Sequence, residues 1–322
     1  MTISSSSRSG KKASKSKANN AEPPVKPSSP KESAKAETAS APRTTRGAAP
    51  LVPLDLGRPG LAAGLIDQIS PVRTHNDLIL SAENSKVLTQ LVTEYRQRDT
   101  FLRHGLAVRS KLLFCGPPGC GKTLTAEVFA RELGLELLVV RLDAVISSFL
   151  GETASNLRQV LEAAQKRPTV LFLDEFDALA RSRTESSGHG ELRRVVNSLL
   201  MMIDRFRGPG FLIAATNLQD ALDEAIWRRF DEVILFDPPG AAQIKAMLKL
   251  KTRNFPTEFD ITAEAGSLAG FSYAEIERVS LEAIRQAILD KRSAISQTDF
   301  KTALKSEQRR RKIRQKVVDS KR

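Results

Sequence analysis

The sequence predicts an α/β fold in which a parallel sheet is flanked by helices and is followed by a small all-helical domain. Three observations lead to this prediction. Apolar runs of strand length alternate with helical periods between residues 112 and 236, a pattern typical of parallel sheets covered on both faces. A glycine-rich turn joins the first of these strands to a helix at residues 116–123. After Pro239 only helical periods remain.

The chain has 322 residues, which is enough for about two domains. Residues 1–70 are predicted to form a disordered basic N-terminal arm and linker. Ser, Ala, Lys, Pro and Thr dominate residues 1–50, and such a segment cannot bury enough apolar surface to offset the entropy of ordering. We expect the large α/β domain at 71–240, the helical domain at 241–308 and a basic C-terminal tail at 309–322.

Each expected element rests on an apolar period, and a helix over about 82–102 precedes the first strand. The expected strands are Leu112–Phe114, Glu136–Leu142, Thr169–Leu173, Phe211–Ala215 and Glu232–Phe236. Further helices are expected over 124–131, 157–164 and 192–203, with loops at 147–152 and 182–190. The helical domain should contain helices around 244–248 and over 261–269, 274–288 and 297–304.

The net charge of +13 is concentrated at the two ends of the chain. Residues 1–50 carry ten Lys or Arg against three Asp or Glu, residues 305–322 carry nine against two, and the rest sums to −1. Flexible basic arms often contact nucleic acid or acidic partners. Solvated tails that aid solubility fit the same composition.

Cysteine content and hydropathy bear on the cellular compartment. The chain has two cysteines, too few for a metal site or a disulfide framework, which fits a reducing compartment. No apolar run approaches the ~18–20 residues of a membrane span, and the N-terminus lacks the apolar core of a secretory signal. An organellar transit peptide stays open, since residues 1–21 contain no acid. We therefore expect a cytoplasmic protein with no membrane span.

A phosphate-binding loop (P-loop) follows the first strand. It fits G-x-x-x-x-G-K-[ST] between a buried strand and a helix, with the residues Gly116, Pro117, Pro118, Gly119, Cys120, Gly121, Lys122 and Thr123. Glycines let the backbone aim its N–H groups at a polyphosphate, and the helix N-terminus adds a positive dipole. Lys122 can reach the β- and γ-phosphates, and the Thr123 hydroxyl can hold Mg²⁺. We expect this loop and Leu124, where the helix starts, to bind a nucleoside triphosphate; the alternative is an accidental Gly/Pro turn beside a lysine.

Polar residues also end the third and fourth strands. At the carboxyl end of a buried strand, Asp174 can hold Mg²⁺ opposite the P-loop. Glu175 beside it can orient and deprotonate an attacking water. Asn217 ends the following strand, where its side chain would contact the γ-phosphate and help to place that water. The alternative is that the acids simply cap a strand and that Thr-Asn is ordinary turn chemistry.

Two arginines and one acidic residue complete the candidate set. Arg228 and Arg229 precede the last strand, and arginine stabilises charge on a transferring phosphoryl group even when another chain supplies it. The alternative is a pair of surface arginines. Asp77 begins a short apolar stretch that could line a base-binding pocket beside the P-loop; the alternative, ordinary packing, is the more usual role of such a stretch.

These motifs, in this order and followed by a helical lid domain, resemble an AAA-family ATPase module of the type found in katanin, spastin and the proteasomal ATPases. The resemblance covers about residues 72–308. It implies a P-loop ATPase that converts ATP and water to ADP and phosphate with Mg²⁺. It also implies a homo-oligomeric ring, usually a hexamer, with ATP at the subunit interfaces. In such a ring Arg228 and Arg229 match the arginine fingers that act on the neighbour's nucleotide.

The resemblance further implies a central pore that grips an extended polypeptide. Phe149, Leu150 and Gly151 match the aromatic–hydrophobic–glycine loop that lines the pore in the family. His189 stands where a second pore loop would be. The alternative for Phe149 is a core aromatic residue.

The sequence departs from the family pattern at positions expected to lie near the nucleotide base. The stretch Gly270–Ile276 is similar to the family's G-x-S-G-A-D-[IL] stretch, but Tyr273 replaces a glycine, which leaves the local adenosine contact open. Ala274 still matches a position that lies against the nucleotide in relatives. The acidic-Ile-Gly-Gly signature is absent, with Asp77-Leu78-Ile79 near its place. The sequence also contains no H-E-x-x-H zinc-protease motif.

The expected function is Mg-dependent ATP hydrolysis in an oligomeric ring that remodels or unfolds a protein substrate, recruited directly or through an adaptor and threaded through the pore. The alternative is a nucleic-acid-associated ATPase switch in which the basic arms hold DNA or RNA. Phe149 discriminates between the two, because threading needs this side chain whereas a switch does not. A third possibility is a scaffold that needs ATP only to assemble.

Overall fold

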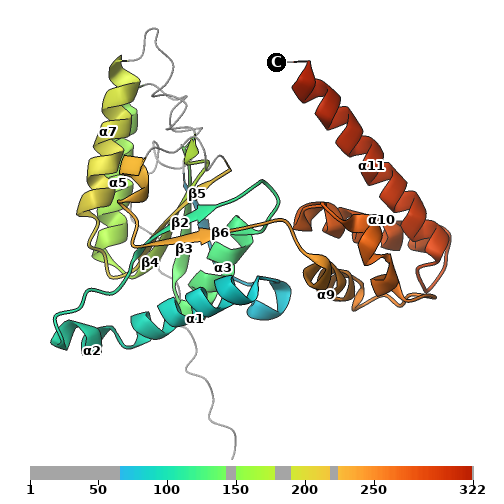
Figure 1. Ribbon diagram of the computed structural model, residues 1–322. Helices are drawn as coiled ribbons and strands as arrows, with labels where there is room; N and C mark the ends of the chain where they lie inside the picture. The colour runs from blue at the N-terminus through green and yellow to red at the C-terminus, as the bar shows by residue number, and fades with distance from the viewer. Residues whose placement is uncertain (1–65, 143–149, 178–189, 218–223, 321–322) are drawn as a thin grey trace, which may run out of the picture. The chain divides into compact units, whose positions relative to one another are not determined.

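The computed structural model describes residues 66–142, 150–177, 190–217 and 224–320. Within these ranges the strands form one six-stranded sheet in the order β1-β3-β4-β5-β2-β6 (Figure 1). The strands are β1 (Ile66–Ile69), β2 (Lys111–Cys115), β3 (Glu136–Arg141), β4 (Thr169–Asp174), β5 (Phe211–Thr216) and β6 (Glu232–Leu235). Every neighbouring pair is parallel except β1–β3. The predicted parallel sheet is therefore confirmed, with one antiparallel edge strand added.

The central strands are buried along almost their whole length. Every residue of β5 and all but the first of β2 are buried, because a parallel sheet covered on both faces needs near-continuous apolar runs. Side chains alternate between the two faces: Leu113 and Leu171 belong to one core cluster, and Phe114 and Phe172 to the other.

Helices cover both faces of the sheet, as predicted (Figure 1). The main ones are α1 (Ala82–Arg96), α3 (Lys122–Leu133), α5 (Leu150–Lys166) and α7 (Gly190–Arg205). Apolar residues of α5 and α7 pack with one face of the strands, and those of α1 and α3 pack with the other. Shorter helical segments are η1 (His75–Asp77), α2 (Arg98–Arg103) and α8 (Glu224–Trp227).

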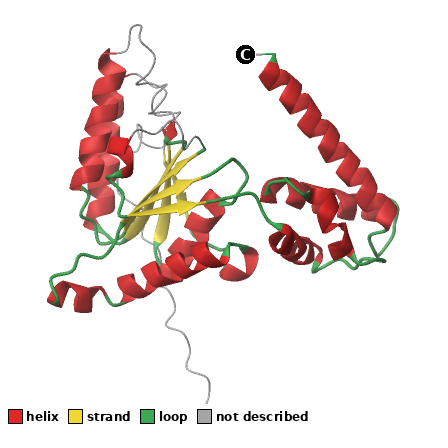
Figure 2. Cartoon of the chain, in the orientation of Figure 1, coloured by secondary structure: helices red, strands yellow, loops and turns green. Residues whose placement is uncertain are grey.

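The predicted lid domain is helical (Figure 2), and its buried apolar side chains form a core of their own. Its elements are α9 (Ala241–Thr252), the 3₁₀-helix η3 (Ile261–Leu268), α10 (Tyr273–Leu289) and α11 (Gln297–Asp319). Leu248, Leu268, Ile276 and Phe300 are completely buried at its centre. Among the helices of the described ranges, none is long and apolar enough to cross a membrane.

Four residues of the expected linker form a strand instead. Ile66 pairs with Val140 and Ile69 with Leu137 in the antiparallel β1–β3 ladder. Ile66 packs against one core cluster and Ile69 against the other. The prediction of a linker through residue 70 was wrong at this point, because a four-residue edge strand offers too short a period to detect. The rest of the predicted arm lies outside the described residues.

Two helix predictions also need correction. The helix expected over 82–102 is divided into α1 and α2 at Gln97. Residues 309–319, predicted as a tail, continue α11 without interruption. Lys, Arg and Gln dominate this segment, and they favour helix while no Gly or Pro breaks it.

Candidate active site

The P-loop, Asp174 and Asn217 come together at one edge of the sheet. Strands β4, β5 and β2 are neighbours, and the three motifs follow their carboxyl ends, which is where open α/β sheets bind ligands. A cavity of about 350 Å³ lies at this edge. Its wall includes residues 118–124, Asp174, Glu175 and Asn217, with Asp77, Tyr273 and Ala274 on other elements.

The P-loop backbone requires glycine at specific positions. Gly116 has φ 144°, and a Cβ at this position would lie 2.1 Å from the carbonyl oxygen of Phe236. Gly119 and Gly121 have φ of 78° and 94°, a region that other residues rarely adopt. The loop therefore curls into a cradle that side chains would fill. This shape fits a polyphosphate, whose oxygens accept hydrogen bonds from backbone N–H groups.

Lys122 is buried beneath this cradle. Its Nζ donates to the carbonyl oxygens of Gly116 (2.6 Å) and Pro117 (3.1 Å) and to Oδ1 of Asn217 (2.8 Å). Burial lowers the pKa of Lys122, and the charges of nearby acidic groups oppose that shift. Within the described part of the chain, no carboxylate forms an ion pair with this ammonium. A phosphate would supply the missing counter-charge.

Asp174 and Glu175 share the cavity wall with the P-loop. Oδ1 of Asp174 accepts the N–H of Glu175 at 2.9 Å. Glu175 has φ 54°, a left-handed conformation that costs energy for any residue with a Cβ, and its side chain is exposed. Backbone strain of this kind is concentrated at functional sites.

The residues present fit magnesium bound together with a nucleotide. In the ranges that the structure describes, no group of three or more His, Cys, Asp or Glu side chains could hold a metal ion. Mg²⁺ in nucleotide sites takes one or two protein oxygens together with phosphate oxygens and water. Thr123 and Asp174 both line the cavity and carry oxygens of this type.

Asp177 was not predicted as a site residue. Its side chain is 2% exposed, and its Oδ1 accepts the N–H of Asn217 at 3.3 Å. Its charge also raises the pKa of the neighbouring Lys122, against the effect of burial. Asp177 stands three residues after Asp174 in the sequence. No sequence pattern indicated which of these acidic side chains would be buried.

Asp77, Leu78 and Ile79 form part of the same wall. The Asp77 carboxylate is already engaged: Oδ2 accepts the N–H and the hydroxyl of Thr74, both at 3.1 Å, and Oδ1 lies 3.2 Å from Nη2 of Arg253. These contacts, led by the Thr74 backbone, lower the pKa of Asp77. The side chains that remain for a base at this point are the apolar Leu78 and Ile79.

The first turn of α10 packs directly on the P-loop. The N–H of Ala274 donates to the carbonyl oxygen of Gly119 at 3.1 Å. A Cβ on Gly119 would lie 3.0 Å from Oγ of Ser272 and 3.1 Å from Cβ of Ala274. Tyr273 also reaches the cavity, and burial raises its pKa to about 12, so its phenol is uncharged at neutral pH.

Arg228 and Arg229 do not line the cavity of their own chain. The Arg228 side chain is 75% exposed and pairs with Glu224 one helical turn earlier. Nε of Arg229 donates to Oδ2 of Asp204 at 3.2 Å. Both residues follow α8 and precede β6.

Two of the expected pore residues, Phe149 and His189, lie outside the described residues. Leu150 and Gly151 are the first two residues of α5, whereas a loop was predicted through residue 152. That prediction was wrong for residues 150–152. A glycine is tolerated in the first turn of a helix, because the N–H groups there have no intrahelical partner in any case.

Comparison with known proteins agrees with this geometry. A family model described as "ATPase family associated with various cellular activities (AAA)" matches residues 112–238, which include the P-loop, Asp174, Glu175 and Asn217. The "Uncharacterized AAA family ATPase y4kL" of Sinorhizobium fredii is 56% identical over 274 residues, which cover 85% of this chain and 81% of that protein.

More distant relatives have named activities. The "Proteasome-activating nucleotidase 2" of Haloferax volcanii is 35% identical over 73% of this chain and 59% of its own length. The "ATP-dependent zinc metalloprotease FtsH" of Halothermothrix orenii is 33% identical over 72% of this chain and 38% of its own length. The chain thus spans less than two thirds of these two relatives. The AAA family model matches this chain, and the Sinorhizobium fredii AAA ATPase is 56% identical to it over most of both chains. The chain therefore belongs to the AAA family of ATPases.

Proposed function

We propose that this ATPase works as an oligomeric ring, hexameric in form, that hydrolyses Mg-ATP between subunits and uses the cycle to remodel or unfold a protein threaded through a central pore. One observation carries the proposal. Lys122, Asn217 and Glu175 face a single cavity, whereas Arg228 and Arg229 lie outside it. The site of one chain therefore lacks these two arginines, which a neighbour would bring.

The chain's own residues divide the work at the phosphates. Lys122 and Asn217 would bind the γ-phosphate, and Thr123 and Asp174 would hold Mg²⁺, whose charge would offset that of the phosphate oxygens. Glu175 orients the attacking water and takes its proton. The apolar wall of Leu78 and Ile79 would take the adenine, as a largely apolar pocket with few polar groups suits a flat base.

Arg228 and Arg229 would complete the site of the neighbouring subunit. Arginine supplied by another chain can stabilise the charge of phosphoryl transfer, and the exposure of Arg228 leaves it available for that role. A single subunit should therefore hydrolyse ATP slowly, and ATPase activity per subunit should rise steeply with protein concentration.

A protein substrate, delivered directly or by an adaptor, is supported by the names of two relatives. One is called a proteasome-activating nucleotidase and the other an ATP-dependent zinc metalloprotease. Phe149, Leu150 and Gly151 would grip the polypeptide, with His189 in a second pore loop. This sequence has no H-E-x-x-H motif, so it would supply the ATPase part of such a system. We also propose a cytoplasmic location.

The test compares two variants of the full chain. Glu175→Gln should bind a fluorescent (mant) ATP analogue, stay assembled and hydrolyse ATP very slowly. Phe149→Ala should keep ATPase activity but lose the unfolding of proteins captured by the Glu175→Gln trap. Wild-type turnover in Glu175→Gln would contradict the catalytic assignment. Unfolding retained by Phe149→Ala would contradict threading.

The second candidate is a nucleic-acid-associated ATPase switch. The observation that favours it is the exposed basic surface of α11, together with the net charge of +7 on residues 1–50 that follows from the sequence. Binding of a fluorescent single-stranded DNA or RNA, with affinity falling steeply as salt rises, would support it. Deletion of residues 1–50 should then weaken nucleic-acid binding. Any unfolding of proteins by the wild type would not depend on that binding.

A further inference from the structure

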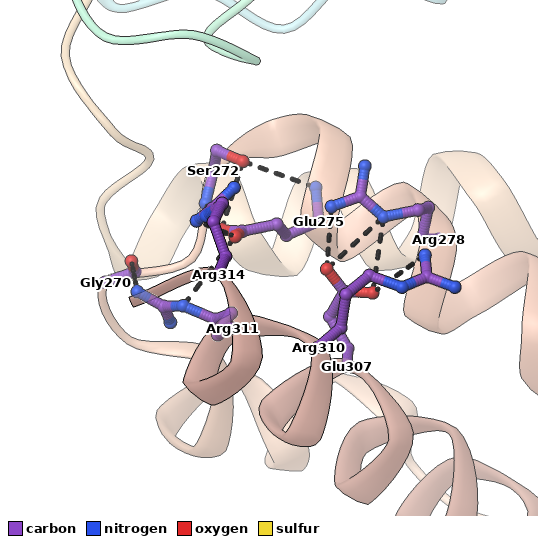
Figure 3. A network of polar contacts seen from close by, with 8 residues as sticks. All are labelled: Gly270, Ser272, Glu275, Arg278, Glu307, Arg310, Arg311 and Arg314. Carbon is purple, nitrogen blue, oxygen red and sulfur yellow. Dashed lines mark hydrogen bonds and ion pairs between the residues drawn. The ribbon is translucent and has the colours of Figure 1, made fainter. Parts of the chain in front are cut away.

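The C-terminal helix reaches the nucleotide site through one buried carboxylate. Glu275 lies in the first turn of α10 and is 3% exposed. Its Oε2 accepts the N–H (2.8 Å) and the hydroxyl (3.1 Å) of Ser272. Its Oε1 accepts a hydrogen bond from Nη2 of Arg314 at 2.9 Å and lies 3.6 Å from Nε of Arg311 (Figure 3). Both arginines belong to α11.

Arg311 also holds the other side of the same turn. Its Nη2 donates to the carbonyl oxygen of Gly270 at 3.1 Å, and its guanidinium lies 4.4 Å from the centre of the Phe271 ring. A cation over an aromatic face at this distance is attractive. Gly270 has φ 76°, so the chain reverses there into the turn that precedes α10. Arg311 therefore contacts Gly270 and Phe271 of this turn as well as Glu275.

The turn in question is the one that packs on the P-loop. Ser272 and Ala274 lie against Gly119, and the N–H of Ala274 donates to the Gly119 carbonyl oxygen. A continuous set of contacts thus leads from Arg314 through Glu275 and Ser272 to the loop that would hold the phosphates.

The negative charge of the Glu275 carboxylate is balanced by the two arginines of the network. Burial by itself would raise the pKa of Glu275, but hydrogen bonds from Ser272 and the charges of Arg311 and Arg314 outweigh burial and keep the pKa below its ordinary value. Without the arginines, a buried carboxylate would lose its charged partners, which is costly. The carboxylate would then move toward water, and the Ser272 turn that it caps would move with it.

A second network on the same two helices serves as a comparison. Glu307 of α11 is 4% exposed. Its carboxylate accepts a hydrogen bond from Nη2 of Arg278 at 2.6 Å and another from Nη1 of Arg310 at 3.5 Å (Figure 3). It has the same composition as the first network: one buried glutamate and two arginines. Within the part of the chain that the structure describes, its hydrogen bonds join α10 to α11 and do not include the Gly270–Ala274 turn or the P-loop.

We propose that Arg311 and Arg314 are positioning residues for the nucleotide: acting through Glu275, they hold the Gly270–Ala274 turn against the P-loop and thereby raise the affinity for ATP. This inference rests on the proposed nucleotide site. The basic end of α11 is then part of the ATPase, in addition to being a surface extension of the lid domain.

The test compares two double variants of the full chain. Arg311→Gln/Arg314→Gln should weaken binding of mant-ADP, measured by fluorescence anisotropy, by about tenfold, since hydrogen bonds between charged groups are lost at the turn. The KM for ATP should rise more than kcat falls. The control, Arg278→Gln/Arg310→Gln, should lower the melting temperature but leave mant-ADP affinity within about twofold, because these arginines donate to Glu307 and make no hydrogen bond to the turn.

Equal losses of affinity in both double variants would overturn the proposal, because the contacts would then serve folding only. Unchanged affinity in Arg311→Gln/Arg314→Gln would overturn it as well. Arg311→Lys/Arg314→Lys keeps both charges and should recover part of the affinity. If the wild-type protein bound no mant-ADP, the proposed nucleotide site itself would be wrong, an outcome distinct from any difference between the variants.

Discussion

Lys122 donates a 2.8 Å hydrogen bond to Oδ1 of Asn217 across 95 positions of the sequence. The contact joins the P-loop after β2 to the end of the adjacent strand β5. It places an amide beside the buried ammonium, where the proposed function puts the γ-phosphate. The N–H of Asn217 is held in turn by Asp177, so both the backbone and the side chain of this residue are fixed.

Asn217→Ala should therefore lower kcat for ATP by about 10²–10³-fold, because one preorganised polar group at the reacting phosphate is lost. Affinity for mant-ADP should change little, since ADP lacks the γ-phosphate. Steady-state ATPase assays and a mant-ADP titration measure the two effects. A wild-type kcat, or an equally large loss of mant-ADP affinity, would show that Asn217 does not act at the γ-phosphate.

Replacing Glu175 separates its proposed catalytic role from its backbone strain. Both Glu175→Ala and Glu175→Gly remove the carboxylate, so both should lose ATP hydrolysis by about 10²-fold or more. Only glycine relaxes the φ of 54°. Glu175→Gly should therefore be more stable than Glu175→Ala by about 0.5–1 kcal/mol, after allowance for the entropy of glycine in the unfolded chain. Urea unfolding measures this difference, and equal stabilities would argue against strain at this residue.

Gly116 should not tolerate a side chain. In Gly116→Ala the new Cβ would stand 2.1 Å from the Phe236 carbonyl oxygen, so β6 or the P-loop must move, at a cost of more than about 2 kcal/mol in the free energy of unfolding. Gly266 of η3 is the matched control, because a Cβ there meets no atom within 4 Å and its φ is not positive. Gly266→Ala should be neutral or slightly stabilising. Similar unfolding midpoints for both variants would contradict the close approach at Gly116.

Asp299 should make the stability of the protein depend on pH. Hydrogen bonds from Arg292, followed by those from Ser296, hold the pKa of Asp299 well below its usual range despite the opposing effect of burial. A folded-state pKa below the unfolded value means that the stabilisation is complete above about pH 4 and is lost as the pH falls below it.

Asp299→Asn should therefore destabilise the protein at pH 7 by about 1–3 kcal/mol, because charged hydrogen bonds to a buried group are lost. The difference from wild type should shrink in urea unfolding experiments as the pH falls from 5 to 3. A difference that stays constant over this range would show that the Asp299 charge does not contribute. Asp290, which also pairs with Arg292 but is exposed, provides the control: Asp290→Asn should have a much smaller effect at every pH.

The elements that were predicted correctly are those whose signal is local. The P-loop, the buried apolar strands and the helices of the lid domain each depend on residues within a short window. The errors fall where local signals are short or ambiguous. β1 has four residues, and the run of Lys and Arg after residue 308 is compatible with either a solvated tail or a helix. The position of Leu150 and Gly151 in α5 has the same cause, because a helix start after Phe149 carries no strong capping residue.

By itself, the sequence determined the α/β class, the order of the motifs and the P-loop with its glycines, because hydrophobic period and backbone freedom are properties of neighbouring residues. Only the tertiary structure decided which distant side chains meet. It turned Asp177 inward toward Asn217, and it brought Arg314 to Glu275 across 39 positions. Such contacts depend on how the sheet orders its strands and how the helices pack, and no local pattern encodes either. The proposed active site of this ATPase is built from such contacts between distant residues.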